Sequence, residues 1–310
     1  MSLLVAGSSG MVGSALVRNL SRNGLNVHSM SRKNVDFLDE KLTLKYIDSI
    51  QPETIVIAAA KVGGIGSNNN YPVEFLEANL RIQQSLIGAA FKVGIPRLVF
   101  LGSSCIYPRD CPQPIKEEYL MSGPLESTNS AYAIAKIAGI ELVKSYRNEY
   151  GLNWISLMPT NLYGPGDNFN LISSHVMPSL IRRFIEAVDT KKSDVVLWGT
   201  GAPRREFLHV DDLASAVFAC LDQYDDSLHL NVGTGNDLTI KELALKVAMA
   251  TGFKGNVSWN PAMPDGTPRK VLEVSRIKAL GWAPTITLDE GIASTIAWYR
   301  DASTRGEARK

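Results

Sequence analysis

The sequence has only three cysteines, Cys105, Cys111 and Cys220, and only four histidines among 310 residues. A sparse, odd-numbered set of cysteines in a chain of this length does not form a disulfide framework. It favours reduced thiols and a cytoplasmic setting. These cysteines and histidines also lack the spacing of a zinc site. We therefore predict no structural metal and no disulfide.

Long apolar runs and an excess of one charge are also missing. The longest apolar segments are far shorter than the roughly 20 residues that cross a bilayer. Residues 1–6 have neither the basic region nor the small-residue cleavage site of a signal peptide. The formal net charge is +1, so the composition indicates neither nucleic acid nor a membrane surface as a partner. A small-molecule ligand is the remaining expectation.

Short apolar runs alternate with helical patterns in the first half of the chain. Strands are expected at residues 3–6, 26–30, 54–58, 98–101 and 154–158, and helices at residues 11–20, 73–93 and 129–150. This alternation is typical of parallel βαβ units, and nearly continuous apolar strands indicate a sheet covered on both faces. The predicted fold class is α/β, a Rossmann-type doubly wound parallel sheet.

The texture changes after about residue 160, where loops rich in Gly, Pro, Asn and Asp interrupt shorter elements. We predict a dinucleotide-binding domain over residues 1–160 and a smaller substrate-binding lobe over most of residues 161–310. The chain is expected to return to the sheet near residues 205–232, followed by a helix at residues 239–250. The charged tail, residues 300–310, is expected to fray.

Three glycines follow the first expected strand with the spacing G-x-x-G-x-x-G. Gly7 permits a tight turn, Gly10 lets the backbone approach a diphosphate, and Gly13 allows close packing of helix on strand. The helix N-terminus then attracts the phosphates. A plain turn is the alternative, but the position at the first βα junction favours a dinucleotide. The predicted cofactor contacts here are Gly7, Ser8, Ser9, Gly10, Met11, Val12 and Gly13.

The end of the second expected strand distinguishes the two nicotinamide dinucleotides. NAD sites carry an acidic residue about 20 residues beyond the glycines, whereas this chain reads Met30-Ser-Arg-Lys33. An arginine pairs with a 2′-phosphate, which an aspartate would repel. We therefore predict NADP(H), with Arg32 on the 2′-phosphate and Asp36 near the adenine. A solvated loop charge is the alternative for Arg32.

Tyr132 and Lys136 lie four residues apart in the helix expected at residues 129–150, so their side chains share a helix face. A phenol, with a pKa near 10, becomes a better acid–base group when a nearby ammonium stabilises its anion. Such a pair is also a common accident on helices. The glycine turn and Ser103, at the end of the fourth expected strand, favour the catalytic interpretation.

The chain resembles extended short-chain dehydrogenase/reductases that act on nucleotide sugars, and within them the GDP-L-fucose synthases. These are GDP-4-keto-6-deoxy-D-mannose 3,5-epimerase-4-reductases. The resemblance spans nearly the whole chain, although the expected basic residue is missing at Ser8-Ser9. The segments that carry it are Leu101-Gly-Ser-Ser-Cys-Ile-Tyr-Pro108, Asn129-Ser-Ala-Tyr-Ala-Ile-Ala-Lys-Ile-Ala-Gly139, Met158-Pro-Thr-Asn-Leu-Tyr-Gly-Pro165, Ser174-His-Val176, Arg205-Glu-Phe-Leu-His-Val-Asp-Asp212 and Asp265-Gly-Thr-Pro-Arg-Lys270.

The resemblance implies epimerisation at C3 and C5 of a 4-keto sugar, followed by NADPH-dependent reduction at C4. Cys105 would act as base and His175 as acid, with a cation such as Lys136 or the nicotinamide favouring the thiolate. Ser103 and Tyr132 would bind the C4 oxygen. Lys136 would hold the nicotinamide ribose and lower the pKa of Tyr132. Alternatively, Cys105 is a small buried hydrophobe and His175 is a locally bonded residue at a helix N-terminus.

The same resemblance implies further contacts and an assembly. Arg183, Trp198, Arg205, Asp265 and Lys270 would bind the GDP-sugar, with Trp198 in a loop that covers the nucleotide. A homodimer would form through the helices at residues 73–93 and 129–150. The remaining cofactor contacts would be Leu101, Gly102, Ser103, Ser104, Lys136, Pro159, Thr160, Asn161, Leu162 and His175.

Three other functions remain open at this level. A nucleotide-sugar 4-epimerase or dehydratase would keep a tightly bound NAD and return the hydride. A GDP-colitose-type enzyme would epimerise one centre rather than two. A non-enzymatic dinucleotide-responsive protein could use the same fold, but we would then expect Tyr132 or Lys136 to be lost.

Overall fold

Six parallel strands form the central sheet of the protein, in the order β10-β5-β4-β3-β1-β2. The computed structural model describes residues 1–263 and 265–309, and all five strands expected from the sequence are present in it. The sixth strand lies at residues 230–232, at the end of the range where the chain was expected to return to the sheet. The strands are β1 (Ser2–Ala6), β2 (Asn26–Met30), β3 (Thr54–Ile57), β4 (Arg97–Leu101), β5 (Asn153–Pro159) and β10 (Leu230–Val232).

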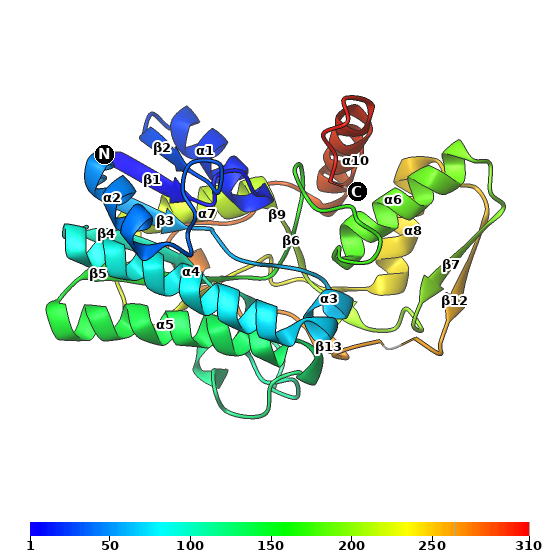
Figure 1. Cartoon of the computed structure of the whole chain (residues 1–310). Coiled ribbons are helices and arrows are strands. Elements are labelled where there is room, and N and C mark those ends of the chain that lie inside the picture. The colour runs from blue at the N-terminus through cyan, green and yellow to red at the C-terminus, as the bar shows by residue number, and fades with distance from the viewer. Residues whose placement is uncertain (264, 310) are drawn as a thin grey trace.

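Helices cover both faces of this sheet, as in a doubly wound fold (Figure 1). α2 (Glu40–Ile50), α4 (Pro72–Val93) and α5 (Ser130–Tyr150) pack side by side, and α1 (Met11–Arg22) packs against α7 (Val210–Gln223). α4 and α5 end at Gly94 and Gly151, whose φ angles of 80° and 68° favour glycine. The predicted fold class is confirmed, although the sequence analysis did not identify α2 and α7.

A smaller lobe lies beyond the carboxyl edge of the sheet (Figure 1). Its hydrophobic core is separate from the main one and draws on residues 163–299. The predicted helix at residues 239–250 is confirmed as α8, which begins with a capping box formed by Thr239 and Glu242. The lobe contains α6 (Val176–Asp189), α8 (Ile240–Thr251), α10 (Leu288–Thr304) and the parallel pair β7 (Asp194–Trp198) and β12 (Asn256–Asn260).

Short elements connect the two parts and carry much of the site. β8 (Arg204–Arg205) pairs with β11 (Leu238–Thr239) and β13 (Arg269–Lys270), and β6 (Asn161–Tyr163) pairs with β9 (Phe207–His209). The main core also takes up Leu272, Ile277 and Trp282. The chain therefore crosses between the two parts more often than the sequence indicated. The other short elements are α3 (Ile65–Asn70), α9 (Ser275–Ala279) and the 3₁₀ turns η1 (Ser104–Ile106), η2 (Glu117–Tyr119) and η3 (Ser127–Asn129).

The C-terminal segment is held in place, which corrects the expectation that it frays. Asn168 and Arg309 form an isolated β-bridge. The amide of Phe169 donates to the carbonyl of Arg309 at 2.8 Å, and the Arg309 side chain donates to the carbonyl of Gly166. The tail thus supplies backbone partners to a loop of the smaller lobe. Lys310, also covered by the expectation, lies outside the described residues.

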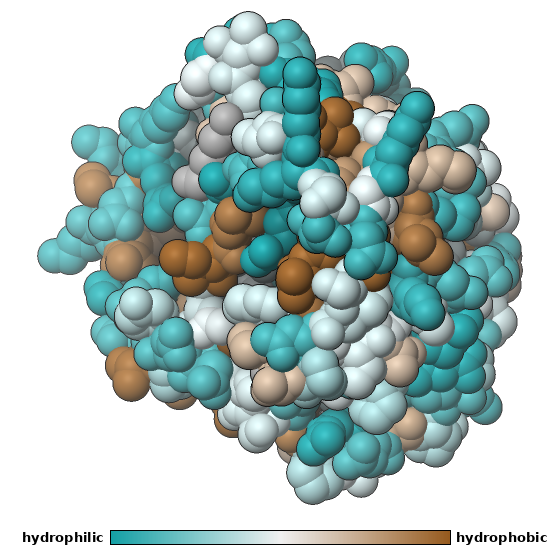
Figure 2. Space-filling model, turned by 90° about the vertical axis from the view of Figure 1, so that its right-hand side faces the viewer, coloured by the Kyte–Doolittle hydropathy of each residue, from teal (hydrophilic) through white to brown (hydrophobic). Residues whose placement is uncertain are grey.

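Most of the molecular surface shown in Figure 2 is hydrophilic, with a group of hydrophobic side chains near the middle. In the smaller lobe, Val196 and Trp198 of β7 and Leu245 and Met249 of α8 are large exposed hydrophobic residues. No helix within the described ranges is long and apolar enough to cross a membrane. The three cysteines are free thiols.

Candidate active site

The glycine turn between β1 and α1 has the geometry that a diphosphate requires. Gly7 has φ +93°, and a Cβ on Gly13 would lie 2.1 Å from the carbonyl oxygen of Gly7, so neither position accepts a side chain. A Cβ on Gly10 would meet only that carbonyl, at 3.5 Å. Gly10 is also the N-cap of α1 and provides no side-chain cap. The first amides of α1 therefore have no side-chain cap and are available to an anion.

Arg32 and Asp36 follow β2 beside this turn, and both are exposed. No ion pair is found for Arg32 within the described part of the chain. Its guanidinium is therefore available to a 2′-phosphate. One oxygen of Asp36 accepts the amide of Leu38 at 3.0 Å and so shapes the loop. The residues at this end of the sheet fit a phosphorylated dinucleotide, and the roles of Arg32 and Asp36 remain predictions.

Ser103, Tyr132 and Lys136 converge at the carboxyl end of β4. Lys136 is buried, and its ammonium donates to the carbonyl of Leu101 at 2.8 Å. Its nitrogen lies 5.9 Å from the centre of the Tyr132 ring. The Tyr132 ring packs edge-on against Phe75 of α4, with centroids 6.5 Å apart. Helix α5 therefore presents both side chains to the end of β4, as their spacing of four predicts.

The electrostatics of Tyr132 differ from the expectation. Burial raises its pKa above the ordinary value, the nearby Cys105 thiol group raises it further when ionised, and a hydrogen bond with the Ser103 side chain lowers it. Burial also lowers the pKa of Lys136 to about 8. In the protein alone, desolvation thus outweighs the effect expected from the lysine, which is directed to the Leu101 carbonyl. Tyr132 is therefore a protonated phenol, ready to donate.

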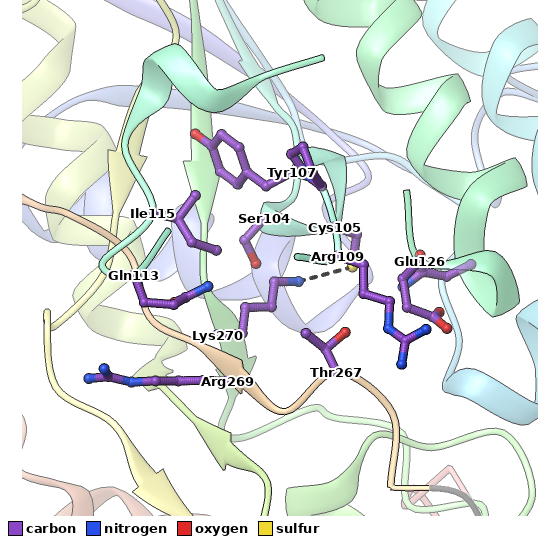
Figure 3. Close-up of a pocket in the computed structure, with 12 residues that line it drawn as sticks. Ser104, Cys105, Tyr107, Arg109, Gln113, Ile115, Glu126, Thr267, Arg269 and Lys270 are labelled. Carbon is purple, nitrogen blue, oxygen red and sulfur yellow. Dashed lines mark hydrogen bonds between the residues drawn. The ribbon is translucent and has the colours of Figure 1, made fainter. Parts of the chain in front are cut away.

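Cys105 lies in η1, which begins directly after Ser103. The Ser103 hydroxyl accepts a hydrogen bond from the Cys105 amide at 3.2 Å. The thiol is half-buried, and the ammonium of Lys270 lies 3.5 Å from its sulfur (Figure 3). The sequence analysis expected Lys136 or the nicotinamide as the cation near this thiol. The structure instead places Lys270 there, because β13 and η1 line the same pocket. The buried-hydrophobe alternative does not describe a thiol that lines a polar pocket.

His175 is the N-cap of α6, and its side chain makes no capping hydrogen bond. The residue is exposed to solvent, although protein atoms surround the imidazole closely enough to desolvate it. Desolvation and then the charge of Lys270 lower its pKa below the usual value. His175 is therefore neutral at pH 7 in the protein alone. The charge of Lys270 thus acts on His175, and its ammonium also contacts Cys105, although 70 positions separate Cys105 and His175 in the sequence.

The two predicted arginines of the substrate site lie on opposite elements. Arg183 of α6 donates to the Ser179 hydroxyl at 3.3 Å, whereas its neighbour Arg182 pairs with Glu186 at 2.6 Å. Only Arg183 of this pair is therefore left for an anion. Arg205 of β8 donates to the carbonyl of Arg204. Burial lowers the pKa of Arg205, whereas the charges of Cys105, Asp265 and Glu126, when ionised, raise it.

Trp198 and Asp265 are placed differently from the expectation. Trp198 ends β7, paired with Asn260, rather than lying in a loop, and 57% of its surface is exposed. It thus sits on a rigid strand end from which it can stack on a base. Asp265 accepts both the amide and the hydroxyl of Thr200, each at 2.7 Å. Its oxygens therefore already connect two loops, and a contact with ribose stays a prediction.

The remaining predicted cofactor residues lie at the carboxyl edge of the sheet. The amide of Gly102 donates to Leu157, and a Cβ on Gly102 would clash with Met158. Thr160 and Asn161 both donate side-chain hydrogen bonds to the carbonyl of Glu206. β4 and β5 end side by side, so these segments border one opening. It is bordered by Leu101, Gly102, Ser103, Ser104, Pro159, Thr160, Asn161 and Leu162.

The comparison with protein families matches residues 3–233 to the NAD dependent epimerase/dehydratase family. The chain belongs to this family. Probable GDP-L-fucose synthase 1 of Oryza sativa subsp. japonica is 50% identical over 299 residues, covering 96% of this chain and 91% of the relative. GDP-L-fucose synthase of Escherichia coli (strain K12) is 46% identical over 313 residues, covering 98% of each chain.

Members of the family with solved structures share the architecture. The crystal structure of a GDP-L-fucose synthetase from Naegleria fowleri bound to NADP superposes with a TM-score of 0.91 at 25% identity. The match covers 99% of this chain and 96% of that one. The likeness extends over both the sheet and the smaller lobe.

Several residues that line the pocket beside Cys105 in this protein were not identified from the sequence. Arg109, Gln113, Glu126 and Thr267 come from loops with no periodic pattern (Figure 3). The cluster of charged residues around Cys105 becomes visible only when residues 267–270 fold back over residues 104–126. A partial signal was available, because Thr267 belongs to the motif Asp265-Gly-Thr-Pro-Arg-Lys270.

Proposed function

We propose that the protein is a GDP-L-fucose synthase. It converts GDP-4-keto-6-deoxy-D-mannose to GDP-L-fucose by epimerisation at C3 and C5 and NADPH-dependent reduction at C4. The observation that carries the proposal is the position of Cys105 beside the Ser103–Tyr132 pair. A ketone reductase needs only that pair and Lys136, whereas a thiol at the same place supplies a base for the carbons next to the ketone.

Epimerisation uses the acidity of the protons at C3 and C5, which are both α to the C4 ketone. Cys105 as thiolate removes a proton from one face, and the hydroxyls of Ser103 and Tyr132 stabilise the negative charge on the enolate oxygen. His175 then donates a proton to the opposite face. Because His175 is neutral in the protein alone, we propose that the negative charge of bound GDP-sugar raises its pKa and lets it take up this proton.

The cofactor of the reduction is NADP(H). When bound, it supplies the hydride that reduces C4. The first amides of α1 hold its diphosphate, Arg32 its 2′-phosphate and Lys136 its nicotinamide ribose. Tyr132 donates its phenolic proton to the C4 oxygen as the alcohol forms. The resulting phenolate regains a proton through solvent, helped by the positive charge of Lys136.

The GDP moiety binds in the smaller lobe. Arg183 and Arg205 neutralise its diphosphate, and Trp198 covers the base by stacking. Asp265 holds the Thr200 loop beneath the nucleotide, from which it can also reach the ribose hydroxyls. The predicted division into residues 1–160 and 161–310 places the reaction between a cofactor-binding part and a GDP-binding part.

Exposed apolar residues on two helices bear on the assembly of the protein, and its free thiols bear on the cellular setting. Val73 is 71% exposed, Ile134 49% and Tyr150 51%, and all three lie on the adjacent helices α4 and α5. We propose a homodimer that covers these apolar side chains, which light scattering can test. The free thiols fit a reducing cytoplasm.

The deciding experiment supplies GDP-4-keto-6-deoxy-D-mannose with NADPH, and in parallel with NADH, and identifies the product by NMR. Inversion at both C3 and C5, with one NADPH consumed per product, is the expected result. A product inverted at one centre would instead indicate a colitose-type enzyme. Turnover without net consumption of NADPH would refute the reductase and favour a 4-epimerase.

A further inference from the structure

Lys270 lies at the centre of the charged groups around Cys105. Its ammonium is 3.5 Å from the Cys105 sulfur, across 165 positions of sequence (Figure 3). No carboxylate within the described ranges lies at ion-pair distance from Lys270. The positive charge is therefore not already neutralised by an aspartate or a glutamate. A thiolate at Cys105 is the natural anionic partner for it.

The backbone around Lys270 is held from both sides. β13 pairs with β8 so that Lys270 lies opposite Arg205, and the Arg204 amide donates to the Pro268 carbonyl at 2.8 Å. On the other side, the Val271 amide donates to the Gln113 side chain at 3.0 Å. A lysine side chain is flexible, but the backbone that carries the Lys270 side chain is held in place by these hydrogen bonds.

A fully buried carboxylate also holds the backbone next to Lys270. Glu206 accepts the amide of Leu272 at 2.9 Å and the amide of Gly235 at 2.7 Å. It follows Arg205 in the sequence and so connects β8, the loop after β10 and the segment that carries Lys270. Buried carboxylates are costly unless they are fully hydrogen-bonded. One of the hydrogen bonds of Glu206 holds the backbone two residues beyond Lys270.

Several other titratable or charged groups lie around the thiol. Arg205 approaches it from β8, and Tyr132 from α5 as a neutral phenol. Arg109 and Glu126 line the wall of the same pocket. Arg205 adds positive charge, while Glu126 opposes it. Among residues 1–263 and 265–309, only Lys270 has a hydrogen bond to the sulfur.

We propose that Lys270 is a positioning residue for epimerisation, which holds Cys105 as the thiolate base rather than binding the diphosphate of the substrate. The inference rests on the proposed function. The thiolate takes the proton from the carbon next to the ketone, so a C–H bond breaks, an S–H bond forms and the electron pair moves to the enolate oxygen. His175 gives a proton to the other face. Solvent then deprotonates the thiol and protonates the imidazole.

The two roles for Lys270 predict different defects. A diphosphate ligand would raise KM and weaken epimerisation and reduction together. A partner of the thiolate would control the pH dependence of Cys105 and the exchange of protons at C3 and C5, and would leave direct C4 reduction in place. The family resemblance implies that Lys270 contacts the substrate, so the experiment also tests that prediction.

The test compares Lys270→Met and the milder Lys270→Gln with the wild-type enzyme. Alkylation of Cys105 by iodoacetamide is followed across pH 6 to 10 by mass spectrometry of its own peptide, separately from Cys111. We expect the midpoint of the reaction to move up by about 1 to 2 pH units in both variants. In D₂O at pH 7, deuterium incorporation at C3 and C5 should fall by at least about tenfold.

Arg269→Met is the matched control. Arg269 is the neighbouring residue on β13, pairs with Asp237 at 2.5 Å and points away from the thiol in Figure 3. Removing its charge should leave the alkylation midpoint of Cys105 within about 0.3 pH units of the wild-type value, because the sulfur keeps its Lys270 partner.

Unchanged midpoints in both folded Lys270 variants, with raised KM for the GDP-sugar, would overturn the inference in favour of a diphosphate ligand. An equal shift in Arg269→Met would also overturn it, by showing a general charge effect. If the wild-type enzyme itself exchanges no proton at C3 or C5, the proposed function fails instead. The two failures are therefore distinguishable.

Discussion

Replacing Lys136 with methionine should inactivate the enzyme and at the same time stabilise its fold. Methionine has nearly the same length and suits an apolar site. It cannot hold a nicotinamide ribose or assist Tyr132. The rate of C4 reduction should fall by at least about 100-fold, as expected for loss of an acid–base partner.

The stabilisation can be estimated from the burial of the ammonium. Burial lowers the pKa of Lys136 from 10.5 to about 8, and Lys136 is only 4% exposed. At about 1.36 kcal/mol per pKa unit, holding this charge in the native state costs about 3 kcal/mol at pH 7. Methionine removes that cost but loses the hydrogen bond to the Leu101 carbonyl, which offsets about 1–2 kcal/mol. The free energy of unfolding of the variant at pH 7 should therefore be about 1–2 kcal/mol higher than that of the wild-type enzyme.

The same lowered pKa of Lys136 also predicts how the stability gain depends on pH. Between pH 8 and 10.5 the unfolded wild-type chain holds a proton on Lys136 that the native state lacks. The contribution of Lys136 to the stability of the wild-type enzyme is therefore greatest above pH 10.5 and is lost as the pH falls through about 8. In Lys136→Met this contribution to the slope is absent, so the gain over wild type should shrink as the pH rises from 8 to 10.

Denaturant unfolding at pH 7, 8, 9 and 10 measures both quantities. Lys144→Met is the control, because Lys144 is an exposed lysine on the same helix and its loss should change the unfolding free energy by no more than about 0.5 kcal/mol. The reasoning is refuted if Lys136→Met is destabilised at pH 7, or if its advantage over wild type does not depend on pH.

Two other changes test parts of the site, and a third tests the buried carboxyl of Asp167. Cys105→Ser should abolish epimerisation and leave some direct C4 reduction, and formation of GDP-L-fucose at the wild-type rate would exclude Cys105 as the base. Arg32→Ala should raise KM for NADPH by about 10- to 100-fold with little change for NADH, and equal effects on both cofactors in steady-state kinetics would contradict the 2′-phosphate contact. Burial raises the pKa of Asp167 from 3.8 to about 7, so its contribution to stability is full below pH 3.8 and lost as the pH rises through 7. Asp167→Asn should therefore raise the unfolding free energy at pH 8 by up to about 4 kcal/mol, and an unchanged pH profile in denaturant titrations would rule this out.

The predictable parts of the site are those that depend on neighbours in sequence. The glycine turn, Arg32 after β2 and the Tyr132–Lys136 pair each follow from a spacing within one βα unit or one helix. Strand pattern alone placed Ser103 and Cys105 at the carboxyl edge of the sheet. The local backbone fixes where such side chains point, so short-range patterns suffice.

The electrostatic environment was less predictable. The spacing of Tyr132 and Lys136 suggested a lowered pKa for the phenol, but burial raises it instead. Desolvation depends on everything packed around a group, including Phe75 from α4. A pair of residues four apart on a helix carries no information about that packing.

The sequence by itself determined the doubly wound sheet and the dinucleotide turn, because periodicity and glycine spacing are local properties, and through its resemblance to a known family it nominated the candidate reacting groups. Only the tertiary structure decided which cation faces Cys105. Lys270 reaches the thiol because β13 pairs with β8 and the buried carboxylate of Glu206 binds the backbone beyond it. That contact joins segments 165 residues apart, and it depends on how the smaller lobe packs against the end of the sheet.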